Sequence, residues 1–101
     1  MKTVGTMEAI TKDTNVIYIG QKPMMNYVLA AGKRLGEGGS SVLIQARGKS
    51  ISKAVDVALI TLDRSKGGVK LDDIGINTEV LPGSDGNPLN VSSIKIILSK
   101  P

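Results

Sequence analysis

Residues 42–56, VLIQARGKSISKAVD, decide the fold because a strand pattern changes into a helix pattern within them. The apolar run that turns polar near its end predicts a strand over residues 42–47. Apolar residues then recur every three or four positions, which predicts a helix over residues 50–66. The expected buried stripe of this helix consists of Ile51, Ala54, Val55, Ala58, Leu59 and Leu62. Gly67 and Gly68 should end it.

The segment upstream repeats this succession of strand and helix. Residues 15–19, NVIYI, form a short β-rich run. Pro23 suits the first position of a helix, and helical spacing of apolar residues continues over residues 24–35. Glycines from Gly36 onward should stop this helix.

The last third of the chain changes to a β-rich pattern. Residues 69–81 and 89–98 predict two strands, and the turn-forming PGSDGNP between them places a hairpin tip at Asp85 and Gly86. The order is β-α-β-α-β-β, which predicts an α/β (α+β sandwich) fold: a four-stranded mixed sheet with both helices on one face. We expect residues 15–101 to form a single domain and residues 1–14 to be a flexible N-terminal leader.

The composition excludes several classes of function. The chain has no histidine and no cysteine, so it offers no imidazole base, thiolate nucleophile, disulfide or Cys/His metal site. No apolar run reaches the roughly 18 residues of a membrane span, and the N-terminal residues lack the apolar core of a secretory signal. These features predict a cytoplasmic protein without a membrane partner or cofactor. A net charge of +4 is compatible with a polyanionic partner.

The sequence matches two phosphate-binding motifs only in part. Gly48-Lys49-Ser50 matches the end of a P-loop, but five residues earlier the pattern needs a glycine and finds Leu43, inside the predicted strand. Residues 36–39, GEGG, match the G-x-x-G of KH domains, but they join a helix to a strand and carry Glu37. A bound mononucleotide is therefore not expected.

A broader anion-binding surface remains. If the first two strands are parallel, the loops after them lie at the same edge of the sheet, and each precedes a helix N-terminus. Together they form a cationic ridge of Lys22, Arg47, Lys49 and Lys53. An open ridge suits a phosphate backbone better than a small-molecule substrate.

Three stretches resemble the Alba family of archaeal chromatin proteins: VIYIGQKPMMNYVLA at residues 16–30, ARGKSISKAVD at 46–56 and VSSIKIIL at 91–98. The resemblance covers residue 15 to about residue 100. It implies a fold like that of the C-terminal domain of translation initiation factor three. It also implies a dimer that binds double-stranded DNA and RNA with little sequence preference, associated with the chromosome, and active in DNA condensation.

The resemblance also assigns roles to residues. Nucleic-acid contacts fall on Gln21, Lys22, Asn26, Tyr27, Arg47, Gly48, Lys49, Ser52 and Lys53. For Tyr27, a place in the core is an equal alternative. The hairpin becomes an arm towards the minor groove, with Ser84, Asp85, Gly86, Asn87 and Asn90 near its tip.

This sequence departs from the family pattern at three places. Gln21 stands where many members have an acetylatable lysine, so that control should be absent. The arm tip lacks the usual arginines, so insertion should be weaker or use hydrogen bonds from Asn87 and Asn90. Arg64 is followed by Ser65 instead of the phenylalanine used between dimers. Contacts between dimers would then depend on Leu59, Leu62 and Arg64, or on a paralogue that supplies the aromatic residue.

We therefore expect a non-enzymatic, architectural DNA-binding protein that forms a homodimer or a heterodimer with an Alba paralogue. The alternative is an RNA-binding subunit of an RNA-processing or translation complex. An enzyme ranks third, because Asp72-Asp73 is the one adjacent acidic pair and no further ligand for Mg²⁺ lies nearby in the sequence.

Overall fold

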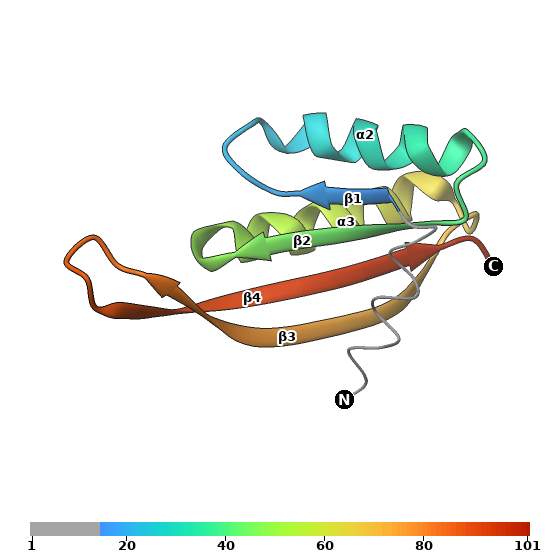
Figure 1. The fold of residues 1–101 in the computed structure, drawn as a ribbon. Helices are drawn as coiled ribbons and strands as arrows, with labels where there is room; N and C mark the ends of the chain where they lie inside the picture. The colour runs from blue at the N-terminus through green and yellow to red at the C-terminus, as the bar shows by residue number, and fades with distance from the viewer. Residues whose placement is uncertain (1–14) are drawn as a thin grey trace.

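The computed structural model describes residues 15–101, so the predicted leader at 1–14 lies outside the described residues. The elements are β1 (Asn15–Tyr18), α2 (Met24–Gly36), β2 (Ser41–Arg47), a 3₁₀ turn η1 (Gly48–Ser50), α3 (Ile51–Ser65), β3 (Lys70–Pro82) and β4 (Pro88–Ser99). Both helices cover one face of a four-stranded mixed sheet (Figure 1). The predicted fold class and element order are confirmed, and each predicted boundary differs from the observed one by at most one residue.

The sheet has the strand order β1-β2-β4-β3. β1 pairs with β2 in parallel, while β2 and β3 both pair with β4 in antiparallel orientation. A parallel pair needs a crossover connection, and α2 supplies it. A bond of 2.9 Å from the backbone N–H of Ile19 to the carbonyl of Gln45 extends the parallel pairing past the end of β1. The loops that follow β1 and β2 therefore lie at the same end of the sheet.

The main core lies between the sheet and the two helices and is almost entirely aliphatic. In α2 the buried residues are Tyr27, Val28, Ala31 and Leu35, which recur at helical spacing. In α3 they are Ala54, Val57, Ala58 and Thr61. The prediction for Leu59 was wrong: its side chain is 58% exposed. Successive helical residues are about 100° apart, so a stripe centred on Ala54 and Ala58 turns Leu59 towards solvent. None of the helices within residues 15–101 has the length and apolar character of a membrane span.

The helix-free face of the sheet has an apolar part and a polar part. Leu43 and Ile97 pair with each other and alternate with core residues, so they point away from the helices, and both are buried. Two residues further along each strand, Gln45 pairs with Lys95, and both are partly exposed. The polar part lies nearer the loops that follow β1 and β2.

The β3–β4 hairpin extends beyond the rest of the sheet. β2 pairs with β4 only as far as Ser93, whereas the pairing of β3 with β4 continues from Thr78 and Ser92 to Pro82 and Pro88. We call residues 78–92 the arm; it projects from the body in Figure 1. At its tip Gly86 has φ of 88°, a conformation that glycine adopts without strain. The predicted hairpin tip is therefore confirmed.

Candidate nucleic-acid interface

Two cationic loops lie at one end of the molecule. The first, residues 20–23, connects β1 to α2, and the second, η1, connects β2 to α3. Because β1 and β2 are parallel, both loops follow the carboxyl ends of their strands. Lys22, Arg47 and Lys49 are all exposed on these loops, and Gln21 is exposed beside Lys22. The structure thus brings together the predicted cations from segments 25 residues apart.

Lys53 connects the first loop to α3 through hydrogen bonds. It lies in the first turn of α3, and its Nζ donates to the carbonyl oxygens of Gly20, at 2.8 Å, and Lys22, at 2.9 Å. An ammonium group has three N–H donors, so two of them are occupied by the first loop. Lys53 was predicted to contact nucleic acid. In the structure it holds the first loop against the start of α3, and its contact with nucleic acid stays a prediction.

Tyr27 supports the same loop from inside. Its ring is buried, and its hydroxyl oxygen accepts hydrogen bonds from the backbone N–H groups of Gly20, at 2.9 Å, and Lys22, at 3.2 Å. The Nζ of Lys53 lies 5.8 Å from the centroid of the ring, within cation–π range. Tyr27 was predicted either to contact nucleic acid or to lie in the core, and the structure places it in the core. Asn26 is exposed one residue earlier.

The second loop depends on a glycine. Gly48 has φ of 51°, in the left-handed region where a side chain would add strain. This turn leads directly into α3, whose first turn carries the exposed Ser52. The N-terminal end of a helix carries a partial positive charge. The end of α3 therefore adds to the field of Arg47 and Lys49.

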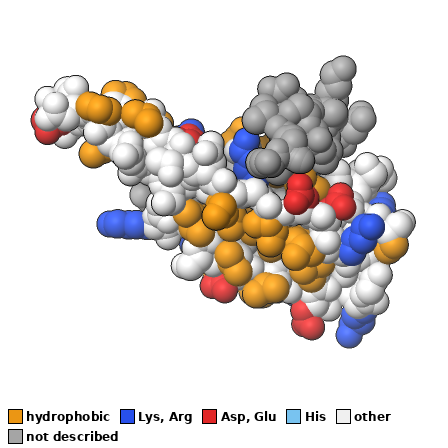
Figure 2. Space-filling view, turned by 90° about the horizontal axis from the view of Figure 1, so that it is seen from below, with side chains coloured by type: hydrophobic (Ala, Val, Ile, Leu, Met, Phe, Trp, Pro, Cys, Tyr) orange, Lys and Arg blue, Asp and Glu red, His pale blue; other side chains and the backbone are white. Residues whose placement is uncertain are grey.

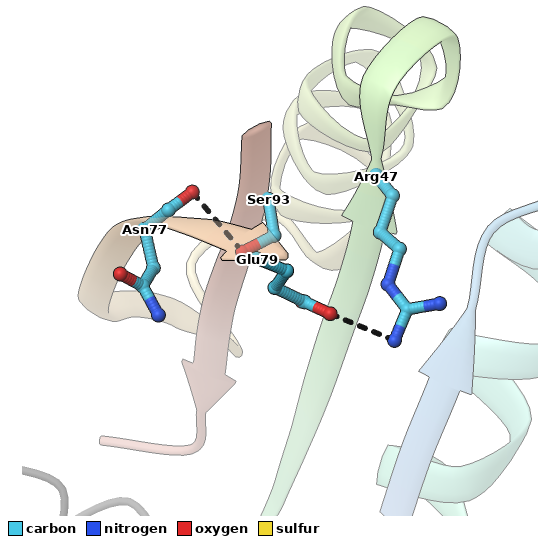
Figure 3. Close-up of polar contacts among 4 residues, drawn as sticks. All are labelled: Arg47, Asn77, Glu79 and Ser93. Atoms are coloured by element: carbon cyan, nitrogen blue, oxygen red, sulfur yellow. Dashed lines mark hydrogen bonds and ion pairs between the residues drawn. The ribbon is translucent and has the colours of Figure 1, made fainter. Parts of the chain in front are cut away.

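Arg47 is held by a carboxylate from the base of the arm. Its Nη2 lies 2.8 Å from Oε1 of Glu79 on β3, and both side chains remain partly exposed. Figure 3 shows Arg47 reaching from the end of β2 towards Glu79, while Oγ of Ser93 donates a 3.3 Å bond to the backbone oxygen of Asn77. Arg47, Ser93 and Asn77 are register partners on β2, β4 and β3, so the ion pair crosses β4. Sequence reasoning missed Glu79, because its distance from Arg47 depends on the strand order.

Comparison with known proteins decides the family. The family model described as Alba matches residues 15–78. The chain belongs to the Alba family. It is 48% identical over 89 residues to the DNA/RNA-binding protein Alba of Methanocella arvoryzae, covering 88% of this chain and 93% of that protein. It is 47% identical over 88 residues to the protein of the same name from Thermoplasma acidophilum, covering 87% and 98%.

Solved structures agree on the Alba fold. Alba from Thermoplasma volcanium superimposes with a TM-score of 0.80 at 48% identity and covers 85% of this chain and all of that one (100%). ALBA1 from Trypanosoma brucei has a TM-score of 0.69 at 23% identity, covering 85% of this chain and 68% of that one. The second likeness concerns the fold alone. The resemblance to the Alba family drawn from the three sequence stretches is confirmed.

The arm of this Alba-family chain is acidic and exposed. Residues 78–92 contain Glu79 and Asp85 but no lysine or arginine. The predicted tip residues Ser84, Asp85, Gly86, Asn87 and Asn90 are all exposed. Asp85 accepts hydrogen bonds from the backbone N–H of Asn87, at 3.0 Å, and from its side-chain amide, at 3.3 Å. These bonds, the backbone one first, hold the pKa of Asp85 below its ordinary value.

The residues predicted for contacts between dimers lie apart from the loops and differ in exposure. Leu59 is exposed, whereas Leu62 is partly buried against the core. Arg64 is exposed on the last turn of α3, where it lines a pocket of about 340 Å³ between α2 and α3. These three residues therefore do not form one apolar surface.

The acidic pair considered for a metal has a local structural explanation. The register of β3 shifts between Leu71 and Asp73, so a bulge includes Asp72. Oδ1 of Asp73 accepts a 2.9 Å bond from the backbone N–H of Ile74. Among residues 15–101, no three acidic side chains gather as a metal ion would require.

Proposed function

We propose that the two cationic loops bind nucleic-acid backbones, and that the chain is an architectural chromatin protein that binds double-stranded DNA without sequence preference and also binds RNA. The observation that carries the proposal is the parallel pairing of β1 and β2. It places Lys22, Arg47 and Lys49 together on open surface beside two helix N-termini. The names of the relatives, DNA/RNA-binding protein Alba, support the same class of ligand.

The same proposal includes a dimer formed along β3. Ile74 and Ile76 pair with the core residues Ile96 and Ile94, so they lie on the helix side of the sheet. The helices pack on β1, β2 and β4, and β3 extends past them, leaving Ile76 80% exposed. The exposed large apolar residues of this region are Leu71, Ile74, Ile76 and Val80 on β3 and Leu59 on α3. Figure 2, which views the molecule from below the orientation of Figure 1, shows orange side chains running across the body.

Such a contiguous apolar patch is typical of a protein–protein interface. A second copy of this chain, or an Alba paralogue with a similar strand, would cover it. A twofold axis there would double the cationic loops. It would also present two arms, whose exposed Asn87 and Asn90 would offer hydrogen bonds in the minor groove.

The proposal includes no catalytic step and places the protein in the cytoplasm on the chromosome. The test is a salt titration of binding to unrelated DNA duplexes. A dimer that neutralises about six phosphates should give a slope of log K against log salt near −5. Arg47→Ala should weaken binding to every duplex similarly, because phosphate contacts carry no sequence information. Loss on one sequence only, or a slope near zero, would contradict backbone recognition.

A competition experiment separates the two cellular roles. Duplex DNA and a structured RNA are offered to the protein at matched salt. Preference for duplex DNA supports the architectural role. A strong preference for the RNA would favour a subunit of an RNA-processing or translation complex. Nuclease activity that persists through exhaustive purification would contradict a purely binding role.

A further inference from the structure

Tyr18 is an exposed aromatic side chain at the end of β1. The chain has two tyrosines and neither phenylalanine nor tryptophan. Tyr27 is buried with its hydroxyl engaged by the first loop, whereas Tyr18 is 71% exposed. Tyr18 is therefore the one aromatic ring in this protein that a ligand can reach.

Tyr18 lies on the polar part of the helix-free face. It pairs with Gln45 on β2, and Gln45 pairs with Lys95 on β4, so the three residues form one row across the sheet. Neighbouring strands are about 4.8 Å apart, which places the Cα of Lys95 about 10 Å from that of Tyr18. Arg47 follows Gln45 by two residues and projects from the same face, about 7 Å further along β2. The open ring thus shares its face of the sheet with an amide and two cations, of which Arg47 extends across β4 towards Glu79.

This arrangement suits an unpaired base. Single-stranded nucleic acids bind sheets on which a base stacks on an aromatic ring while nearby cations neutralise the phosphates. A base within a duplex is already stacked on both faces, so it cannot cover Tyr18. The side-chain amide of Gln45 could hydrogen-bond to a base edge.

We propose that Tyr18, with Gln45, Lys95 and Arg47, forms a stacking site for an unpaired nucleotide of RNA or single-stranded DNA. The proposal rests on the proposed function, because the phosphates reach this face from the cationic loops. Lys22 in the first loop follows Tyr18 by four residues, so the first loop begins directly after the strand end that carries the ring. β1 and β3 are at opposite edges of the sheet. A dimer formed along β3 therefore leaves Tyr18 free.

The test compares Tyr18→Leu, which removes the ring but keeps an apolar side chain, with Tyr18→Phe, which keeps the ring. Each variant is titrated with a single-stranded RNA that does not self-pair, with DNA of the same sequence, and with duplex DNA. Tyr18→Leu should weaken single-strand binding about tenfold with the salt slope unchanged, since stacking is lost and phosphate contacts are not. Tyr18→Phe should bind single strands like the wild type, and all three proteins should bind duplex DNA equally.

Tyrosine fluorescence gives an independent readout, because the chain has no tryptophan. Single strands should quench the emission of the wild type by stacking on Tyr18, and Tyr18→Leu should lose this quenching. Loss of affinity for single-stranded RNA, single-stranded DNA or both supports the site. Comparing the two losses tells which nucleic acid the site prefers. Unchanged single-strand binding by Tyr18→Leu, or an equal loss on duplex DNA, would overturn the stacking site while leaving the proposed function intact. If none of the three probes binds the wild type, the proposed function itself fails.

Discussion

Glu79 holds Arg47 at 2.8 Å across β4, so a cation of the proposed interface is already paired with a carboxylate of the arm. A phosphate that binds Arg47 has to displace this partner. Glu79 is also close enough to repel the phosphate itself. The ion pair thus couples the arm to the cationic loops, and we expect it to oppose binding.

Replacing Glu79 by glutamine should therefore strengthen binding to duplex DNA. We expect Glu79→Gln to raise affinity about threefold at low salt, in the range measured for exposed ion pairs. The salt slope should stay the same, because the same phosphates are contacted. Asp63→Asn is the matched control, since it makes the same charge change at an exposed residue near the far end of α3. An equal gain in both variants would show only an effect of net charge.

Lys53 should act by positioning the first loop. Lys53→Met removes both bonds to the carbonyls of residues 20 and 22 and should weaken duplex binding. If Lys53 only positions the loop, the slope of log K against log salt remains near −5. If Lys53 contacts a phosphate directly, the slope becomes smaller by about one for each protomer. Lys33→Met, at an exposed residue of α2, controls for the lost charge.

The hydroxyl of Tyr27 should contribute measurably to folding stability. Tyr27→Phe keeps the buried ring but leaves the amides of Gly20 and Lys22 without their acceptor. The two lost hydrogen bonds, at about 1 kcal/mol each, lower Tm by about 10 °C in a domain of this size. Thermal melting at fixed protein concentration measures the change. Tyr18→Phe should melt like the wild type, and a similar drop in that variant would contradict the role given to Tyr27.

The proposed dimer can be broken at β3. Ile76→Lys places a charge in the centre of the exposed apolar stripe and should give a folded monomer by sedimentation equilibrium. Because a monomer offers half the phosphate contacts, its salt slope should fall in size from about 5 to about 3. Leu29→Lys adds the same charge at an exposed residue of α2 and should leave the dimer intact. A wild type that sediments as a monomer at micromolar concentration would refute the interface.

The arm tip should respond to pH through Asp85. Its pKa is lowered because the ionised carboxylate accepts bonds from Asn87, so these bonds are complete above the ordinary pKa of aspartate. They are lost only as the pH falls through the lowered value. The amide resonance of Asn87 should therefore titrate with a midpoint below that of a free aspartate, and Asp85→Asn should abolish this titration. A midpoint at or above the ordinary value would contradict the hydrogen-bonded tip.

The order and type of the elements follow from local sequence. Alternation of apolar residues, helical spacing, Pro23 and the glycine-rich turns act within a few residues of each other, and these are interactions that a sequence displays directly. Their limit is visible at Leu59, which fits an apolar helical stripe as well as Val57 does. The choice between them depends on how α3 is rotated on the sheet, and neighbouring elements decide that rotation.

Tertiary structure decided which side chains meet. The parallel pairing of β1 and β2, expected from their connection, brings the two loops together. The bonds of Lys53 to a loop 31 residues away, and of Arg47 to Glu79, depend in addition on side-chain packing and on β4 lying between β2 and β3. The exposed stripe on β3 and the open ring of Tyr18 likewise result from their places at opposite edges of the sheet. Strand order is a property of contacts between distant segments, and for that reason local patterns did not reveal it.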